Sequence, residues 1–188
     1  LKYPPLIVAP FFVFFCFYFH SQKNTGSLKN IFSCLLPALL LAATVLLPFG
    51  DEPVKALQRA FLHSLLSAQA LNLNWIIGRA LLASGDIPLV LQGDQSLQLL
   101  NATQIPAAVK ILSRLLFGFF YGSALWVFLK REKNIDNLLL AALTGHFAYF
   151  MFAIGAHENH LFLSCLLTTA LACRNTQYLP LAAGVWLL

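Results

Sequence analysis

Long runs of apolar residues, separated by shorter polar stretches, make up most of this chain. A bilayer core is about 30 Å thick, and a helix needs roughly 20 residues to cross it. Backbone polar groups inside lipid must be hydrogen-bonded within the protein, so long uncharged runs predict helices. Five such runs, with part of a sixth, are Leu6 to Phe19, Ile31 to Phe49, Ile111 to Leu129, Leu138 to Ile154, Leu161 to Ala172 and Leu179 to Leu188.

The longest polar interruption is the segment 50–106, which has helical patterns of its own. Apolar residues recur at helical spacing over Val54 to Leu71, with basic residues on another face, which is typical of a helix lying in the membrane interface. The apolar stretch Trp75 to Leu82 fits either a partial span or a re-entrant helix. We therefore expect an all-α fold: a polytopic transmembrane helix bundle of about five or six spans, with a partly helical extracytoplasmic loop. Residues 1–188 would form a single integral membrane domain.

Basic residues recur in every second connection between the runs. They are Lys23 and Lys29 after the first run, Lys130, Arg131 and Lys133 after the third, and Arg174 after the fifth. Short cytoplasmic loops are enriched in Lys and Arg, so we expect these connections to face the cytoplasm. The other two connections, residues 50–106 and 155–160, then lie together on the extracytoplasmic face.

The composition agrees with this interpretation, since 59% of the residues are hydrophobic and only 10% are charged. A soluble domain has about 25% charged residues. The formal charge of +5 is spread through short loops, which favours a role in topology over nucleic-acid binding. The four cysteines lie in or beside apolar segments without a C-x-x-C pair, so we expect them to be buried, and we expect no metal site and no cofactor. The chain begins at Leu1 and both ends are apolar, which indicates a fragment of a longer polypeptide.

The connection Gly155 to His160 carries the densest group of chemically active side chains. It places His157, Glu158 and His160 between two apolar runs. Ionisable groups at a membrane boundary are costly enough to indicate function, although an ordinary polar hairpin is the plain alternative. If a helix begins at about Glu158, Asn159 lies in its first turn, where backbone N–H groups favour an anion such as phosphate.

Other polar or small residues within the apolar runs have two interpretations each. Lys110 and Arg114 are four residues apart, so they share a helix face and either bind one anionic group or extend to the lipid headgroups. His146 precedes His157 by three helical turns and is expected to face inward with it. Gly118 and Gly122 form a G-x-x-x-G pattern, which predicts close packing of another helix of this chain.

One segment resembles a known family. Phe150 to Phe162, with the sequence FMFAIGAHENHLF, is similar to the His-Glu-Lys motif that follows a long apolar helix in dolichyl-phosphate-glucose glucosyltransferases. The chain differs from that pattern at Asn159, where the family has Lys.

Two further segments carry the resemblance. In the first, Leu46 to Trp75, the sequence LLPFG, then Arg59-Ala60-Phe61, then Asn74-Trp75 look like the Pro-Phe, Arg and Asn-x-Trp landmarks of a long lumenal loop. In the second, Lys2-Tyr3-Pro4-Pro5-Leu6 looks like the entry into a span. In the order in which they follow along the chain, the three segments resemble the GT-C class of integral membrane glycosyltransferases.

The resemblance implies a hexosyltransferase that moves a sugar from a polyprenyl-phosphate donor to an extracytoplasmic, possibly lipid-linked acceptor. Its membrane would be a bacterial plasma membrane or the endoplasmic reticulum. The family's acidic catalytic base lies in a first extracytoplasmic loop, which would precede Leu1, so no catalytic residue is assigned here. The candidate donor-phosphate or substrate-binding residues are His157, Glu158, His160, Arg59 and Arg114.

Two other classes of function stay open. A transporter or lipid flippase would line a path with polar residues and broken helices, whereas here the polar residues gather at one face. A non-catalytic membrane subunit would hold partners through the face of Gly118.

Overall fold

The computed structural model describes residues 4–22, 36, 40, 43–44, 47–52, 55, 71–85, 105–156 and 158–188. Its α-helices are α1 (Pro4–Gln22), α4 (Leu73–Ala83), α5 (Ala107–Lys130), α6 (Ile135–Phe152), α7 (Phe162–Arg174) and α8 (Leu179–Trp186). Short 3-10 turns cover Leu47–Phe49, Glu158–Leu161 and Thr176–Tyr178. No strand occurs in the described ranges, so the predicted all-α class is confirmed there.

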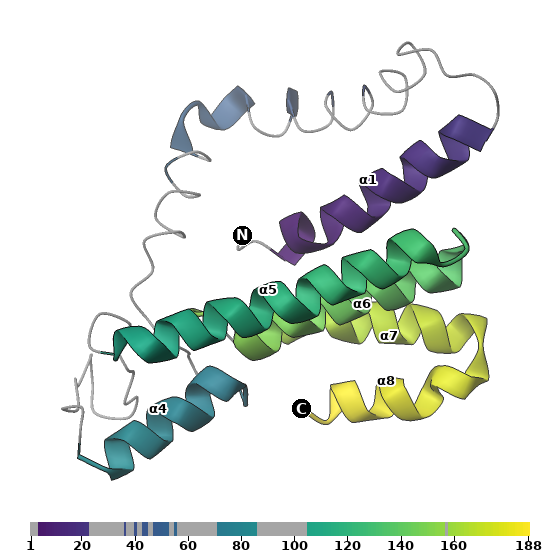
Figure 1. Ribbon diagram of the computed structural model, residues 1–188. Coiled ribbons are helices and arrows are strands. Elements are labelled where there is room, and N and C mark those ends of the chain that lie inside the picture. Colours follow the sequence, from purple (N-terminus) through teal and green to yellow (C-terminus); the bar gives the residue numbers. More distant parts are fainter. Residues whose placement is uncertain are drawn as a thin grey trace.

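The last four helices run back and forth next to one another. In Figure 1, α5 lies along α6, α7 packs against α6, and α8 turns back along α7. Helix α1 crosses the same group and contacts α6. The shared core of α1, α5, α6 and α7 consists of Val8, Phe11, Ala124, Phe128, Leu138, Ala141, Ala142, Leu143, Leu167 and Leu171.

Local capping sets where α5 ends and α6 begins. The ammonium group of Lys133 donates hydrogen bonds to the carbonyls of Phe128 and Leu129, at 2.7 and 3.0 Å, and so satisfies acceptors that the end of α5 leaves free. Asn134 then caps α6, because its Oδ1 atom accepts a hydrogen bond from the backbone N–H of Asn137 at 2.8 Å. The turn between the two helices is therefore well specified by its polar residues.

Two helices of the described part are long and apolar enough to cross a membrane. They are α5, with 24 residues, and α6, with 18. Along α5 the outward side chains are apolar as well: Leu115, Phe119 and Trp126 are each more than 60% exposed, as lipid contact would allow. Helices α7 and α8 have 13 and 8 residues, fewer than the roughly 20 of a crossing, so five or six spans stay a prediction. Most of the predicted run Ile31 to Phe49 and of the predicted interfacial helix Val54 to Leu71 lies outside the described residues.

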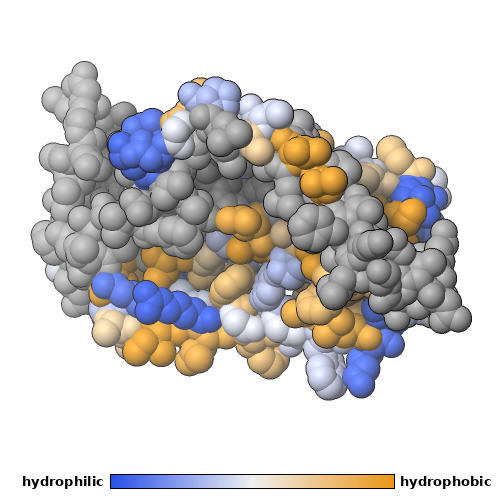
Figure 2. All heavy atoms as spheres, turned by 90° about the horizontal axis from the view of Figure 1, so that it is seen from above, coloured by the Kyte–Doolittle hydropathy of each residue, from blue (hydrophilic) through white to orange (hydrophobic). Residues whose placement is uncertain are grey.

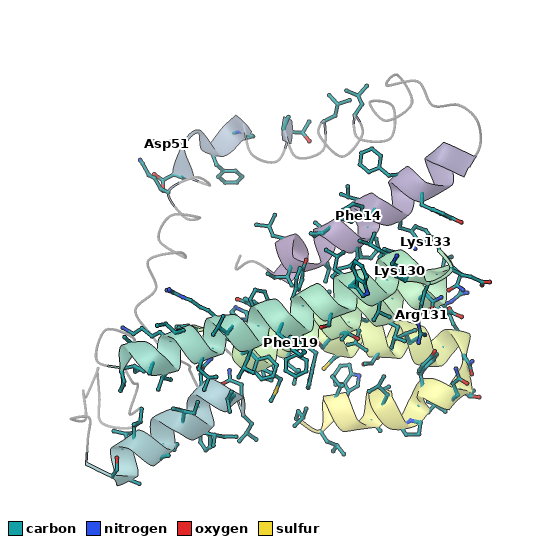
Figure 3. The ribbon with its side chains drawn as sticks, viewed as in Figure 1. Phe14, Asp51, Phe119, Lys130, Arg131 and Lys133 are labelled. Carbon is teal, nitrogen blue, oxygen red and sulfur yellow. The ribbon has the colours of Figure 1, made fainter. Side chains whose placement is uncertain are left out.

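The described basic residues of the connections that follow α5 and α7 gather at one end of the bundle, which we call the basic end: Lys130, Arg131, Lys133 and Arg174. Figure 3 shows the first three together. Arg174 forms an ion pair with Asp136 at the start of α6, and the Lys133 ammonium lies 5.5 Å from the ring centre of Tyr18 in α1. In Figure 2, the strongly hydrophilic described residues gather toward the ends, with hydrophobic residues between them.

The prediction that Gly118 and Gly122 pack against another helix of this chain is wrong for the described part. Both glycines are exposed, and a Cβ atom built on either would meet nothing within 4 Å. The close helix contact occurs at Gly145 instead, where the same construction places Cβ 2.7 Å from the Phe11 ring.

The predicted burial of the cysteines holds for one of the three that the structure describes. Cys165 is buried between α7 and α8, whereas Cys16 and Cys173 are exposed on outer helix faces. Cys34 lies outside the described residues.

Candidate functional site

The connection between α6 and α7 lies at the end opposite the basic end, beside α4 and the start of α5 (Figure 1). We call this region, residues 72–74, 105–114 and 153–161, the histidine end. Helix α6 ends at Phe152, and Gly155 has a φ of 79°, which lets the chain reverse direction at this point. The 3-10 turn Glu158–Leu161 then leads into α7. The α-helix begins at Phe162, one residue after the start of the predicted run Leu161 to Ala172. Asn159 therefore lies in the 3-10 turn and not in the first turn of α7.

Two buried asparagines join α4 to the end of α6. The Asn72 amide donates to the Phe150 carbonyl at 3.2 Å, and the Asn74 amide donates to the carbonyls of Phe152 and Ala153 at 3.0 and 3.1 Å. Both side chains are fully buried. The last carbonyls of a helix have no partner within the helix, so these amides satisfy acceptors that would otherwise be left free.

Helix α5 takes part in the same contact through Ser113. Its hydroxyl donates to the Asn74 Oδ1 atom at 2.6 Å, and the side chain is 1% exposed. The Asn72 Oδ1 atom accepts from the backbone N–H of Trp75 at 2.9 Å and thereby caps α4. We call Asn72, Asn74 and Ser113 the asparagine bridge, because together they connect α4, α5 and α6.

Two histidines, a tyrosine and a serine form a polar cluster between α6 and α7. The His146 Nδ1 atom lies 2.8 Å from the Ser164 hydroxyl, and the Tyr149 hydroxyl lies 3.4 Å from the His160 Nδ1 atom. His146 is fully buried, which confirms that it faces inward. Its Nε2 atom is buried and makes no hydrogen bond to the described part of the protein. Such a group within an apolar bundle is costly and is a common sign of function.

The structure describes three of the five predicted site residues at least in part. His160 is 5% exposed and is turned toward Tyr149, not toward open solvent. Arg114 is exposed on α5, and no hydrogen bond or ion pair joins it to another described residue. The backbone of Glu158 lies in the 3-10 turn; its side chain, like His157 and Arg59, lies outside the described residues.

The carboxylates nearest to the predicted Pro-Phe landmark are already paired. The Lys55 ammonium lies 3.0 Å from Asp51 and 3.2 Å from Glu52, and these two hydrogen bonds raise the pKa of Lys55. No group of three His, Cys, Asp or Glu side chains among the described residues is arranged to hold a metal ion.

Sequence analysis missed Tyr149, Ser164 and Ser113. One signal was present, because His146 and Tyr149 are three residues apart and so share a helix face. The two serines gave none, since a single hydroxyl in an apolar helix more often bonds to its own backbone.

Comparisons with protein-family models, with curated proteins and with solved structures find no match to this chain. The described part thus defines an all-helical protein with two candidate membrane spans and a buried polar cluster at one end.

Proposed function

We propose that this chain is the membrane-embedded part of a GT-C-type glycosyltransferase, which transfers a hexose from a polyprenyl-phosphate donor to an extracytoplasmic, lipid-linked acceptor. One observation carries the proposal: the α6–α7 connection, with Glu158 and His160, lies at the same end of the bundle as the start of α5, with Lys110 and Arg114. An acid, an imidazole and two basic side chains at a membrane boundary suit an anionic lipid headgroup.

The chemistry assigns a role to each group. A departing phosphate develops charge, and fixed cations and hydrogen-bond donors lower the energy of that state. In this proposal Arg59, Arg114 and His157 stabilise the phosphate, and Glu158 orients a histidine or the acceptor. His160 supports the connection from within, as its burial beside Tyr149 suggests. The proposal assigns the general base to no described residue.

The proposal includes a multi-pass topology of five or six spans. The 3-10 turn Glu158–Leu161 and α7 together cover 17 residues, which reaches the lower limit of about 17 for a helical crossing. Helix α1 has 19 residues and lies beside α6. Both helices therefore fit a bundle built around the two longer spans.

The test is sugar transfer by membranes that contain the full-length parent, with a radiolabelled polyprenyl-phosphate hexose as donor. Replacing His157 or Arg59 by alanine is expected to lower transfer about 100-fold or more at unchanged protein level. Lys130→Ala, at the basic end, is the matched control and is expected to keep wild-type activity. Full activity of both His157→Ala and Arg59→Ala, or failure of the parent to use any polyprenyl-phosphate sugar, would contradict the proposal.

A non-catalytic membrane subunit is the second candidate, because the Gly118 and Gly122 face of α5 is open to a helix of another protein. This function predicts no sugar transfer, together with loss of a co-purifying membrane partner in Gly118→Leu. Retention of the partner in that variant would argue against it.

A further inference from the structure

The carbonyl groups at the end of α6 explain why asparagine occurs at positions 72 and 74, at the start of α4. Of the final carbonyls of the helix, that of Tyr149 accepts from the backbone N–H of Ala153 at 2.9 Å. Those of Phe150 and Phe152 accept from the amides of Asn72 and Asn74. Asparagine offers two N–H donors and an acceptor on one short side chain, so it bonds a carbonyl on one helix and a second partner elsewhere.

The orientation of both amides is fixed by their acceptor atoms. The Asn72 oxygen is held by the N–H of Trp75, and the Asn74 oxygen by the hydroxyl of Ser113. Each NH₂ group therefore points to α6. All three side chains are 0 to 1% exposed, so water does not compete for these bonds, and losing one partner leaves a buried polar group unsatisfied.

The same contact continues along the connection that leaves α6. Ile154 belongs to an apolar cluster with Ile105, Val109 and two leucines of α4, Leu81 and Leu82. The chain then turns at Gly155, and Ala156 is fully buried. The course of the connection is thus set by α4 and α5, and not by the α6–α7 hairpin alone.

We infer that Asn72 and Asn74 are positioning residues, which fasten the α6–α7 connection to α4 and α5 and so place the turn Glu158–Leu161, which carries the acid, for the substrate. This inference rests on the proposed function. Phe152 is six residues before Glu158, so the direction in which the chain leaves α6 determines where the acid and the imidazole lie. A displacement of about 1 Å in such a group lowers a rate by about 100-fold.

The alternative is that the asparagines only stabilise the fold, and one substitution separates the two roles. Asn72→Ser keeps a side chain that caps α4 but is too short to reach the Phe150 carbonyl. Asn74→Ala removes the two donors to Phe152 and Ala153. The matched control is Asn134→Ser, because Asn134 caps α6 in the same way, is exposed, and lies at the basic end.

The experiment uses the full-length protein in lipid nanodiscs and measures amide hydrogen exchange together with kcat and KM for sugar transfer. In Asn72→Ser and Asn74→Ala we expect exchange over residues 153–160 to rise about tenfold, with α5 unchanged. We expect kcat to fall about 100-fold, with a much smaller change in KM. Asn134→Ser is expected to match the wild type in both measurements.

Each other outcome has a distinct meaning. Unchanged exchange over 153–160 in Asn72→Ser overturns the inference, even if Asn74→Ala fails to fold. Increased exchange throughout α5 and α7, or a local increase with kcat unaffected, also overturns it, because the asparagines would then act on stability alone. If the wild type transfers no sugar while exchange rises only over 153–160, the glycosyltransferase proposal fails and the fastening of the connection stands.

Discussion

Replacing Gly145 by alanine is expected to destabilise the bundle by about 1 to 3 kcal/mol, the usual effect of adding a methyl group to a packed core. A Cβ atom at this position would lie 2.7 and 2.8 Å from two ring carbons of Phe11 and 3.2 Å from Tyr121. The Phe11 ring has little room to move, since it is fully buried with its centre 5.5 Å from that of Tyr121 and 5.9 Å from that of Phe128. The contact of α1 with α6 and α5 therefore depends on the absence of a side chain at Gly145.

Thermal unfolding in lipid nanodiscs measures this effect. The matched control is Gly122→Ala on α5, where the added methyl group meets open space and the better helix propensity favours a gain of up to about 1 kcal/mol. Combining Gly145→Ala with Phe11→Leu is expected to recover part of the loss, because the smaller side chain makes room for the methyl group. If Gly145→Ala and Gly122→Ala unfold at the same temperature, α1 does not pack on α6 as described.

The positions of α5 and α6 were the most predictable feature of the fold. The runs Ile111 to Leu129 and Leu138 to Ile154 are long and almost free of charge, and the structure extends or trims them by only one to four residues at each end. The ends moved because polar residues cap them: Lys133 bonds to the last carbonyls of α5, and Asn134 caps α6. The run Leu161 to Ala172 was predicted as closely, since α7 begins one residue later and ends two residues later.

The inward face of α5 was not predictable from its sequence. In a soluble helix the buried face is apolar and the outer face is polar, so spacing identifies it. In α5 the exposed Leu115, Phe119 and Trp126 are apolar, as the buried Phe128 is. The spacing of apolar residues therefore does not show which face of the helix points inward. That is why the G-x-x-x-G pattern was assigned to packing within the chain, while the glycine that packs is Gly145 on α6.

The asparagine bridge shows a second limit. From the sequence, Asn74 was recognised only as a landmark beside Trp75, and Asn72 was not recognised. Their partners are backbone carbonyls 78 residues or more away. Every residue carries the same backbone carbonyl group, whatever its side chain. The sequence therefore gives no signal for which carbonyl accepts the hydrogen bond. For the histidine end, the residues of the connection itself were predictable from their charge, whereas the side chains that hold the connection required the structure.

The second large effect concerns the two ends of the bundle, which are expected to lie on opposite sides of the membrane. Thr176 in the α7–α8 connection and Ser84 after α4 are both exposed, and each is close in size to cysteine. In a full-length protein whose native cysteines Cys16, Cys34, Cys165 and Cys173 are replaced, a single cysteine is introduced at either site. Intact cells are then treated with a maleimide that does not cross membranes.

Ser84→Cys is expected to react fully in intact cells, and Thr176→Cys only after the cells are permeabilised. The reason is the distribution of charge: Lys130, Arg131, Lys133 and Arg174 all lie at the end that carries Thr176, and such residues are retained on the cytoplasmic side. The converse pattern would reverse the orientation and move the histidine end into the cytoplasm. Labelling of both cysteines from the same side would mean that the ends do not lie across a membrane from each other, and would remove the basis for a lipid-linked substrate at the histidine end. Replacing Lys130, Arg131 and Lys133 together by glutamine is expected to yield a mixed labelling pattern, because the short connection between α5 and α6 then carries no Lys or Arg.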